Sequence, residues 1–141
     1  MRFWDSSAIV CLLLKEKRST EVLALLRDDP ALVVWCLTEV EIESALSRRV
    51  REGLFKKDEL ESKSRLRIFA ERWEEIVSLD LVRNRALRLL KVHSLTAADS
   101  LQLAAALVFC DERPDGFGLV CLDERLAGAA RLEGFDVLPS I

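Results

Sequence analysis

The chain opens with Met1-Arg2-Phe3-Trp4-Asp5-Ser6-Ser7, and an apolar run follows over residues 8–14. A short apolar strand thus ends on a carboxylate, and two hydroxyl residues lead into a helix. An open α/β sheet begins in this order when its active site lies at the carboxyl ends of its strands. On that interpretation Asp5 is the first ligand of a metal site. The alternative is that Asp5 is a turn residue at the end of a strand, and that Ser6 or Ser7 caps the next helix.

The length and charge of the chain limit what it can be. It has 141 residues, half of them hydrophobic, and a formal net charge of -3 at pH 7. This length suits one compact domain over residues 1–141 that buries its own core. A net negative charge gives no general attraction to nucleic acid, so a polyanionic substrate requires a local basic patch or a metal ion. The longest apolar run, residues 103–110, is far shorter than the roughly 18 residues of a membrane span, and we expect no membrane association.

Four cysteines are present, and their use indicates a cellular compartment. They lie in apolar surroundings at wide, irregular spacings, which favours neither a zinc ribbon nor a redox pair: Cys11, Cys36, Cys110 and Cys121. Buried, reduced thiols of this kind are typical of cytosolic proteins. Residues 8–14 have the apolar character of a secretory signal, but Asp5 precedes them and no small-residue cleavage site follows. We therefore expect a cytoplasmic protein.

Segments of strand length alternate with segments of helical periodicity along the chain. Strands are expected at the amino terminus and over residues 31–35, 76–79, 118–122 and 134–139. Helices are expected over residues 7–16, 19–28, 38–51, 57–76, 80–93, 96–107 and 124–133, with Thr38 and Asp80 as N-caps. Strands separated by helices imply a mostly parallel central sheet with helices on both faces. We predict a three-layer α/β/α domain from which helices 38–51 and 57–76 protrude as a hairpin.

This predicted hairpin carries most of the clustered basic charge. Its basic residues are Arg48, Arg49, Arg51, Lys56, Lys57, Lys63, Arg65 and Arg67. They form either a solvated face or a rim that contacts phosphates or a partner, and the sequence favours neither interpretation. His93, the only histidine, lies where a helix is expected to end, a favourable position for a cation. That position explains His93 better than a role as a catalytic base.

Carboxylates recur where strands end and where helices begin. Asp123 follows a buried strand as Asp5 does, and the carboxyl ends of parallel strands share one edge of a sheet. Asp99 has the spacing of a capping box with Thr96, which would explain it structurally. Yet the helix that Asp99 opens is almost wholly apolar, and a charge placed there needs a partner or a metal ion. We expect Asp5, Asp99 and Asp123 to meet at this edge.

A fourth carboxylate is expected from the helix that begins near Thr38. Glu39, Glu41 and Glu43 crowd its first turns, where the helix dipole alone would favour them. Helical angle does not choose among the three. Four carboxylates close together raise one another's pKa unless a cation lies among them. Oxygen ligands without histidine or thiolate select Mg²⁺ or Mn²⁺, and such sites commonly act on phosphate esters.

Four motifs together resemble the PIN domain, in particular the VapC-type toxins of prokaryotic toxin–antitoxin pairs. They are Trp4-Asp5-Ser6-Ser7-Ala8, Leu37-Thr38-Glu39-Val40-Glu41 followed by Ser44-Ala45-Leu46, Ala97-Ala98-Asp99-Ser100-Leu101-Gln102-Leu103-Ala104, and Leu122-Asp123-Glu124-Arg125-Leu126. The resemblance covers essentially the whole chain and implies a metal-dependent endoribonuclease. Such a protein is usually a homodimer and is kept inactive by a small antitoxin whose carboxyl-terminal segment lies in the groove.

The resemblance also implies roles for single residues. Asp5, Glu41, Asp99 and Asp123 would hold Mg²⁺ or Mn²⁺, and Ser6 would fix the geometry of the first acid or contact the substrate. Glu41 is chosen over its neighbours because it precedes Ser44-Ala45-Leu46. One departure is visible: family members often have Ser or Thr two residues before the last aspartate, and here Cys121 stands there.

Other classes fit the sequence less well. A haloacid-dehalogenase-like phosphatase needs a second aspartate where Ser7 stands, and a receiver domain needs a lysine after its last strand, where Val137-Leu138-Pro139-Ser140 offers none. A non-catalytic PIN-like domain that binds RNA or a partner is the more serious alternative. Four converging carboxylates kept without a metal would be costly to such a domain. A structure-specific DNA nuclease shares the metal chemistry but usually carries additional DNA-binding segments.

Overall fold

We analysed a computed structural model of the chain, which describes residues 1–53 and 59–140. Within these residues the elements follow one another as β1 (Arg2–Trp4), α1 (Ser6–Leu14), α2 (Ser19–Asp28), β2 (Leu32–Trp35), α3 (Thr38–Arg51), α4 (Glu59–Ala70), β3 (Glu74–Ile76), α5 (Leu79–Val92), α6 (Ala97–Phe109), β4 (Gly118–Val120), α7 (Glu124–Glu133) and β5 (Asp136–Leu138). Strands and helices alternate, as predicted.

The strands form one sheet in the order β3-β2-β1-β4-β5, and every described pairing is parallel. Phe3 of β1 pairs with Val33 on one side and with Leu119 on the other. The chain therefore proceeds from β1 to one edge of the sheet and then returns to build the other half beside β1. Ligands of open α/β sheets bind at such a reversal of strand order, outside the carboxyl ends of the strands. Asp5 lies at that point.

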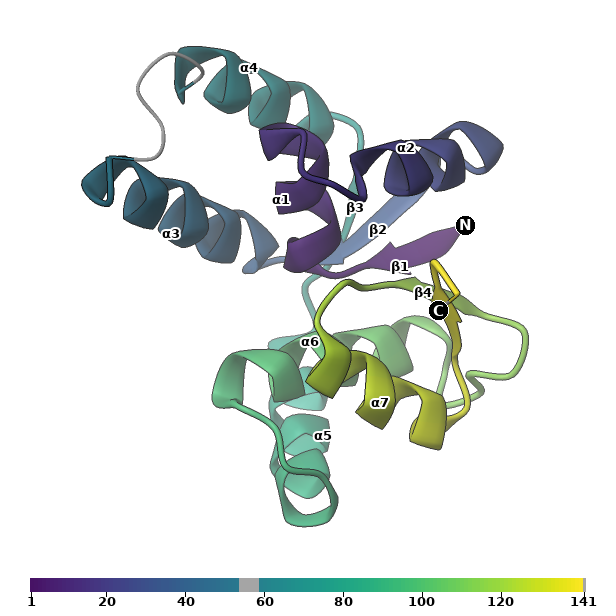
Figure 1. The fold of residues 1–141 in the computed structure, drawn as a ribbon. Helices are drawn as coiled ribbons and strands as arrows, with labels where there is room; N and C mark the ends of the chain where they lie inside the picture. Colours follow the sequence, from purple (N-terminus) through teal and green to yellow (C-terminus); the bar gives the residue numbers. More distant parts are fainter. Residues whose placement is uncertain (54–58, 141) are drawn as a thin grey trace.

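Alternating side chains of the strands form two separate cores. Phe3 and Leu119 belong to the core beneath α5, α6 and α7. Their neighbours Trp4 and Val120 belong to the core beneath α1, α2, α3 and α4. This alternation is the two-residue period of a strand that is buried on both faces. The result is the predicted three-layer α/β/α arrangement, with four helices on one face of the sheet and three on the other (Figure 1).

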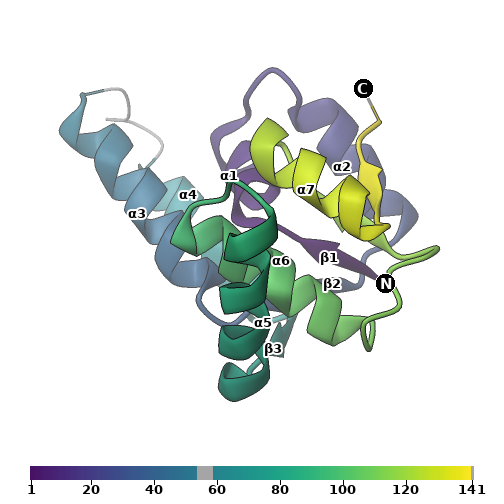
Figure 2. The same ribbon diagram turned by 90° about the horizontal axis from the view of Figure 1, so that it is seen from below.

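Helices α3 and α4 extend beyond the sheet as a pair (Figure 2). The predicted helix over residues 57–76 is too long, because α4 ends at Ala70 and a turn leads into β3. In that turn Arg72 N donates to Phe69 O at 2.9 Å, and Ile76 then pairs with Trp35 of β2. The apolar residues of this segment fit a helical spacing, and a three-residue strand is too short to show a two-residue period. Pairing with β2, not the local sequence, therefore determines that the segment is a strand. Lys56, Lys57 and the predicted start of this helix lie outside the described residues.

Three smaller predictions also need correction. Leu37, not Thr38, is the N-cap of α3, and the buried Thr38 hydroxyl instead accepts a hydrogen bond from Gln102 at 3.0 Å. Ser78, not Asp80, is the N-cap of α5, and Asp80 pairs with Arg83 in the first turn. The predicted strand over residues 76–79 is β3, which lies two residues earlier. A side chain that can cap a helix does not do so where another partner competes for it.

Two findings concern the cysteines and the membrane. Cys11, Cys36, Cys110 and Cys121 are all free thiols, and only Cys36 is not buried. Across residues 1–53 and 59–140, no single helix is long and apolar enough to cross a membrane; α5 and α6, joined at a bend of 118°, satisfy the length and composition criteria only as a pair.

Candidate functional site

Asp5 directly follows β1 and is 3 % exposed. Its backbone N–H donates to Val120 O at 3.0 Å, which continues the parallel pairing of β1 with β4. Its side chain is the N-cap of α1, because Oδ2 accepts the backbone N–H of Ser7 at 3.0 Å. Burial raises the pKa of Asp5, and the two hydrogen bonds from Ser7 oppose that shift. Asp5 thus serves as the helix cap and also places a buried carboxylate at the switch point of the sheet.

Ser7 and Cys121 hold one oxygen of this carboxylate. The Ser7 hydroxyl donates to Asp5 Oδ2 in a short hydrogen bond and accepts the backbone N–H of Leu122 at 2.9 Å. The Cys121 thiol lies 3.7 Å from the same Asp5 oxygen. Burial, and the nearby Asp5 charge to a lesser extent, raise the pKa of Cys121, so the thiol stays protonated. Cys121 therefore offers only a weak hydrogen-bond donor to Asp5.

Glu41 comes from α3 and is held at both oxygens. Ser6 Oγ donates to Oε2 at 2.9 Å, and Gln102 Nε2 donates to Oε1 at 3.2 Å. The pKa of Glu41 is raised to about 7. Burial is the main cause, the charges of Asp5 and Asp99 add to it, and the two hydrogen bonds oppose it. Glu41 is therefore a partly buried carboxylate that is close enough to two other acids to interact with them.

The neighbouring acids of α3 face another way. Glu39 and Glu43 are exposed and line a separate hollow between α3 and α4, together with Lys63 and Arg67. Residues two apart on a helix point about 200° apart around its axis, which separates Glu39 and Glu43 from Glu41. Of the three acids that the sequence leaves open, Glu41 is the one on the face toward Asp5. Its role as a metal ligand stays a prediction.

Asp99 lies in the first turn of α6. Its backbone N–H donates to Thr96 Oγ1 at 3.2 Å, so Thr96 caps this helix as its spacing predicts. The charge of Asp99 raises the pKa of both Asp5 and Glu41. Three of the four predicted ligands, which stem from a strand end and two helix starts, thus form one electrostatic cluster.

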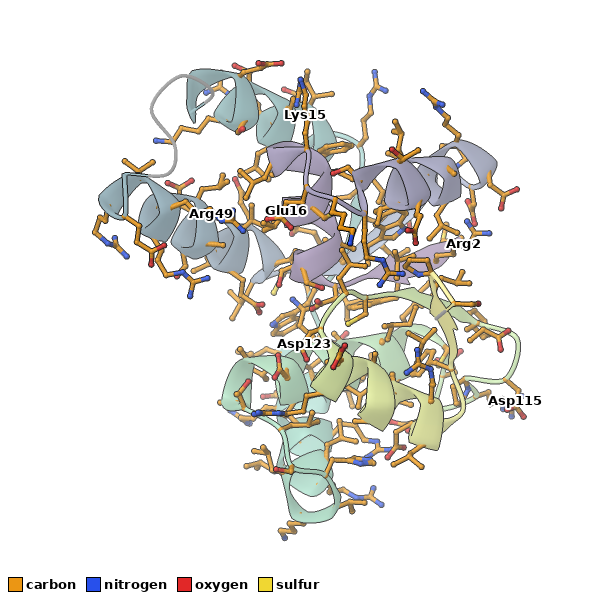
Figure 3. The ribbon with its side chains drawn as sticks, viewed as in Figure 1. Arg2, Lys15, Glu16, Arg49, Asp115 and Asp123 are labelled. Atoms are coloured by element: carbon orange, nitrogen blue, oxygen red, sulfur yellow. The ribbon has the colours of Figure 1, made fainter. Side chains whose placement is uncertain are left out.

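Asp123 is the outlying member of the predicted quartet. It is exposed, and its Oδ1 accepts the backbone N–H of Leu126 at 2.8 Å, which makes it the N-cap of α7. Figure 3 shows its side chain at the start of α7. Asp123 lines the same hollow as Ser6 and Glu41, so it lies at the rim of the cluster.

The hollow continues from these acids to basic residues. It is lined by Ser6, Ser7, Val10, Glu16, Glu41, Ala45, Arg48, Arg49, Leu122 and Asp123. Arg49 of α3 pairs with Glu16, which follows α1, and Figure 3 shows the two side chains between those elements. The hollow therefore has an acidic end at the sheet and a basic end along α3.

The chain matches a known family over most of its length. A family model described as the PIN domain matches residues 2–132. The chain belongs to the PIN domain family. PIN domains are typically nucleases, which are hydrolases, and generally use divalent metal ions. A comparison with curated proteins finds no match.

The donor atoms at this edge of the sheet are of the type that hard divalent cations prefer. They are carboxylate oxygens, and the charges of neighbouring acids, which add to the effect of burial in raising the pKa values of Asp5 and Glu41, are a repulsion that a cation would relieve. In the described part of the chain, no three His, Cys, Asp or Glu side chains are close enough together to hold an ion as they stand. Binding therefore requires rotation of at least one carboxylate toward the others.

Two residues of this PIN-domain site carry structural roles that the sequence did not suggest. Gln102 is 1 % exposed and joins α6 to α3 by donating to both Thr38 and Glu41. An amide three positions after Asp99 on an otherwise apolar helix was an available signal. Ser7 joins Asp5 to the loop before Asp123. Ser7 and Leu122 are 115 positions apart in the sequence, so nothing in the sequence predicted this contact.

His93 lies away from this PIN-domain site. It is the C-cap of α5, as its position predicts, and its Nε2 lies 2.6 Å from Glu133 Oε1. Glu133 is the last residue of α7, whereas Asp123 caps the opposite end of that helix. Ten helical residues separate the two ends by about 15 Å. His93 therefore contacts Glu133, which also pairs with Arg85, and lies away from the acidic cluster.

Proposed function

We propose that this PIN-domain protein is a Mg²⁺- or Mn²⁺-dependent endoribonuclease that hydrolyses RNA phosphodiesters and leaves a 5′-phosphate and a 3′-hydroxyl. The observation that carries the proposal is the convergence of Asp5, Glu41 and Asp99 at the switch point of the sheet. A chain that keeps buried carboxylates together without a compensating cation loses stability. Family membership supports the nuclease chemistry.

Each residue of the site has a part in this proposal. Asp5, Glu41, Asp99 and Asp123 would hold the ion, which when bound supplies an activated water and stabilises charge on the leaving oxygen. Ser6 and Gln102 fix both oxygens of Glu41. Ser7 fixes Oδ2 of Asp5 through its backbone N–H and its hydroxyl. These contacts orient the acids before substrate binds, and such supporting contacts usually matter for metal affinity.

Cleavage of RNA by the purified protein tests the proposal. A mixed pool of structured RNAs is incubated with Mn²⁺, with Mg²⁺ and with EDTA, and the variants D5N and E43Q are compared with the parent. Cleavage should require metal and be reduced by at least about 100-fold in D5N, because an essential ligand is lost. E43Q removes a carboxylate from the same helix but not from the site, so its activity should equal that of the parent.

The same assay separates the competing functions. Cleavage of DNA but not RNA would favour a structure-specific DNA nuclease. Metal-dependent cleavage that persists in D5N would contradict the assignment of the site. Absence of cleavage and of metal binding would favour a non-catalytic PIN-like domain that binds RNA or a partner.

The proposed biological setting is that of a toxin in a type II toxin–antitoxin pair. We propose a cytoplasmic homodimer that a small cognate antitoxin inhibits through the groove. Exposed apolar side chains support an interface, and five of them lie on α5: Leu79, Leu81, Leu87, Leu90 and Val92. Sedimentation of the purified chain at micromolar concentration should give twice the monomer mass. A monomer mass at every concentration would contradict the dimer.

A further inference from the structure

Two arginines near the end of α3 share one hollow with the acids Glu41 and Asp123. Basic residues at a helix carboxyl terminus stabilise the helix, but that effect does not require them to line a hollow. We propose that Arg48 and Arg49 form a subsite for an RNA backbone phosphate flanking the scissile one. In the absence of RNA, Glu16 pairs with Arg49 in place of that phosphate, and RNA displaces it on binding. This inference rests on the proposed ribonuclease function.

The spacing along α3 places the subsite at a suitable separation from the acids. Glu41, Ala45 and Arg48 recur at intervals of four and three residues, so they lie on one face of the helix. Glu41 and Arg48 are about 10 Å apart along the helix axis, at 1.5 Å per residue. The small side chain of Ala45 lies between them and also lines the hollow. A strand whose scissile phosphate lies at the acids therefore passes over Ala45 toward the arginines.

The backbone around Glu16 holds it opposite Arg49. Lys15 ends α1 in the left-handed conformation at φ 52°. Glu16 N then donates to Cys11 O at 3.4 Å, and Glu16 O accepts from Ser19 N at 2.9 Å. This turn between α1 and α2 fixes the backbone of Glu16. Its carboxylate reaches Arg49 from this turn.

The Glu16–Arg49 pair is open to exchange. The two side chains are 36 % and 37 % exposed, respectively. Solvent screens such a pair, so its net contribution to stability is small. A phosphate offers the guanidinium the same bidentate geometry as a carboxylate and carries its charge on several oxygens. RNA can therefore replace Glu16, and the Glu16 carboxylate weakens RNA binding until it does.

Salt-dependent RNA binding tests this inference. A fluorescent single-stranded RNA is titrated with protein in EDTA, which prevents metal-dependent cleavage, at several salt concentrations. E16Q should bind about five-fold more tightly than the parent. Its plot of log affinity against log salt should also be steeper by up to about 0.7, because the Glu16 charge no longer offsets that of Arg49 beside the phosphate and the release of one more counterion from a single strand is expected. The double variant E16Q/R49Q should lose both effects, and R48Q should bind more weakly than the parent.

The control is E21Q, which makes the same change in net charge. Glu21 of α2 pairs at 3.0 Å with Arg18, the N-cap of that helix, and both lie outside the hollow. Equal gains in E16Q and E21Q would contradict the subsite, because general electrostatics would then explain both. Urea unfolding of each variant confirms that the fold is retained.

A single-stranded DNA of the same sequence separates this inference from the proposed function. If DNA binding shows the same dependence on Glu16 and Arg49 but RNA is not cleaved with metal, the subsite stands and the ribonuclease does not. If RNA is cleaved but E16Q behaves as E21Q does, the ribonuclease stands and the subsite does not. If neither nucleic acid binds the parent, the subsite is contradicted.

Discussion

The protonation of Glu41 depends strongly on its surroundings. Its pKa of about 7, against an ordinary value of 4.5, means that the metal-free folded state holds a proton that the unfolded state releases. The folded-state pKa lies above the unfolded one, so this group favours folding at low pH. The free energy of unfolding then falls as pH rises through the interval from about 4.5 to 7.

E41Q removes this titration and is predicted to change the pH dependence of stability. In EDTA, the free energy of unfolding of E41Q relative to the parent should rise by about 2 kcal/mol between pH 5 and pH 8. Urea unfolding at each pH measures the difference. E43Q, whose carboxylate lies on the other face of α3, should show no such trend. Parallel pH profiles for E41Q and the parent would contradict the burial and charge coupling of Glu41.

Helix α7 shows how one residue can serve an element and a site together. Asp123 caps α7 through Leu126 N, and it is also the fourth predicted ligand. Asparagine keeps the capping oxygen but lacks the charge, whereas alanine lacks both.

The two substitutions at Asp123 should therefore separate the two roles. D123A should lower the free energy of unfolding in EDTA by about 1 kcal/mol, and D123N should lower it little. Both should weaken Mn²⁺ binding in calorimetry. If D123N binds Mn²⁺ as tightly as the parent, Asp123 is only a cap, and the ion is held by the other three acids.

At the scale of elements, the strand and helix pattern was largely predictable from the sequence. Phe3, Trp4 and the run at residues 31–35 mark strands buried on both faces, and periodicity and capping residues mark the helices. The boundary between α4 and β3 was not predictable, because Trp73 and Ile76 fit helical spacing and only pairing with β2 makes the segment a strand. Short edge strands take their conformation from a neighbour that lies far away in sequence.

At the same scale, the acids of the site were easier to predict than the groups that hold them. Asp5 and Asp99 could be chosen because they stand at a strand end and at the start of an apolar helix. The contacts of Gln102 with Glu41 and of Ser7 with Leu122 cross 61 and 115 positions of sequence, respectively. Local pattern carries no information about such contacts, which depend on how the layers pack.

For the whole molecule, the order of strands explains why acids from distant segments meet. The order of strands reverses between β1 and β4, so the ends of both strands and the starts of α3 and α6 open at one edge (Figure 1). Separate cores beneath the two helical layers hold that edge in place. We propose that this edge binds a divalent cation through Asp5, Glu41, Asp99 and Asp123.

Titration calorimetry with Mn²⁺ tests that claim most directly, because it requires neither the substrate nor the antitoxin. The parent and E43Q should bind Mn²⁺ with equal affinity, and D5N and D99N should each bind at least about 10-fold more weakly, since a ligand with charge is lost. Circular dichroism of the same samples verifies the fold. Absence of Mn²⁺ binding by the parent, or equal binding by the parent and D99N, would contradict the claim that these carboxylates form a metal site.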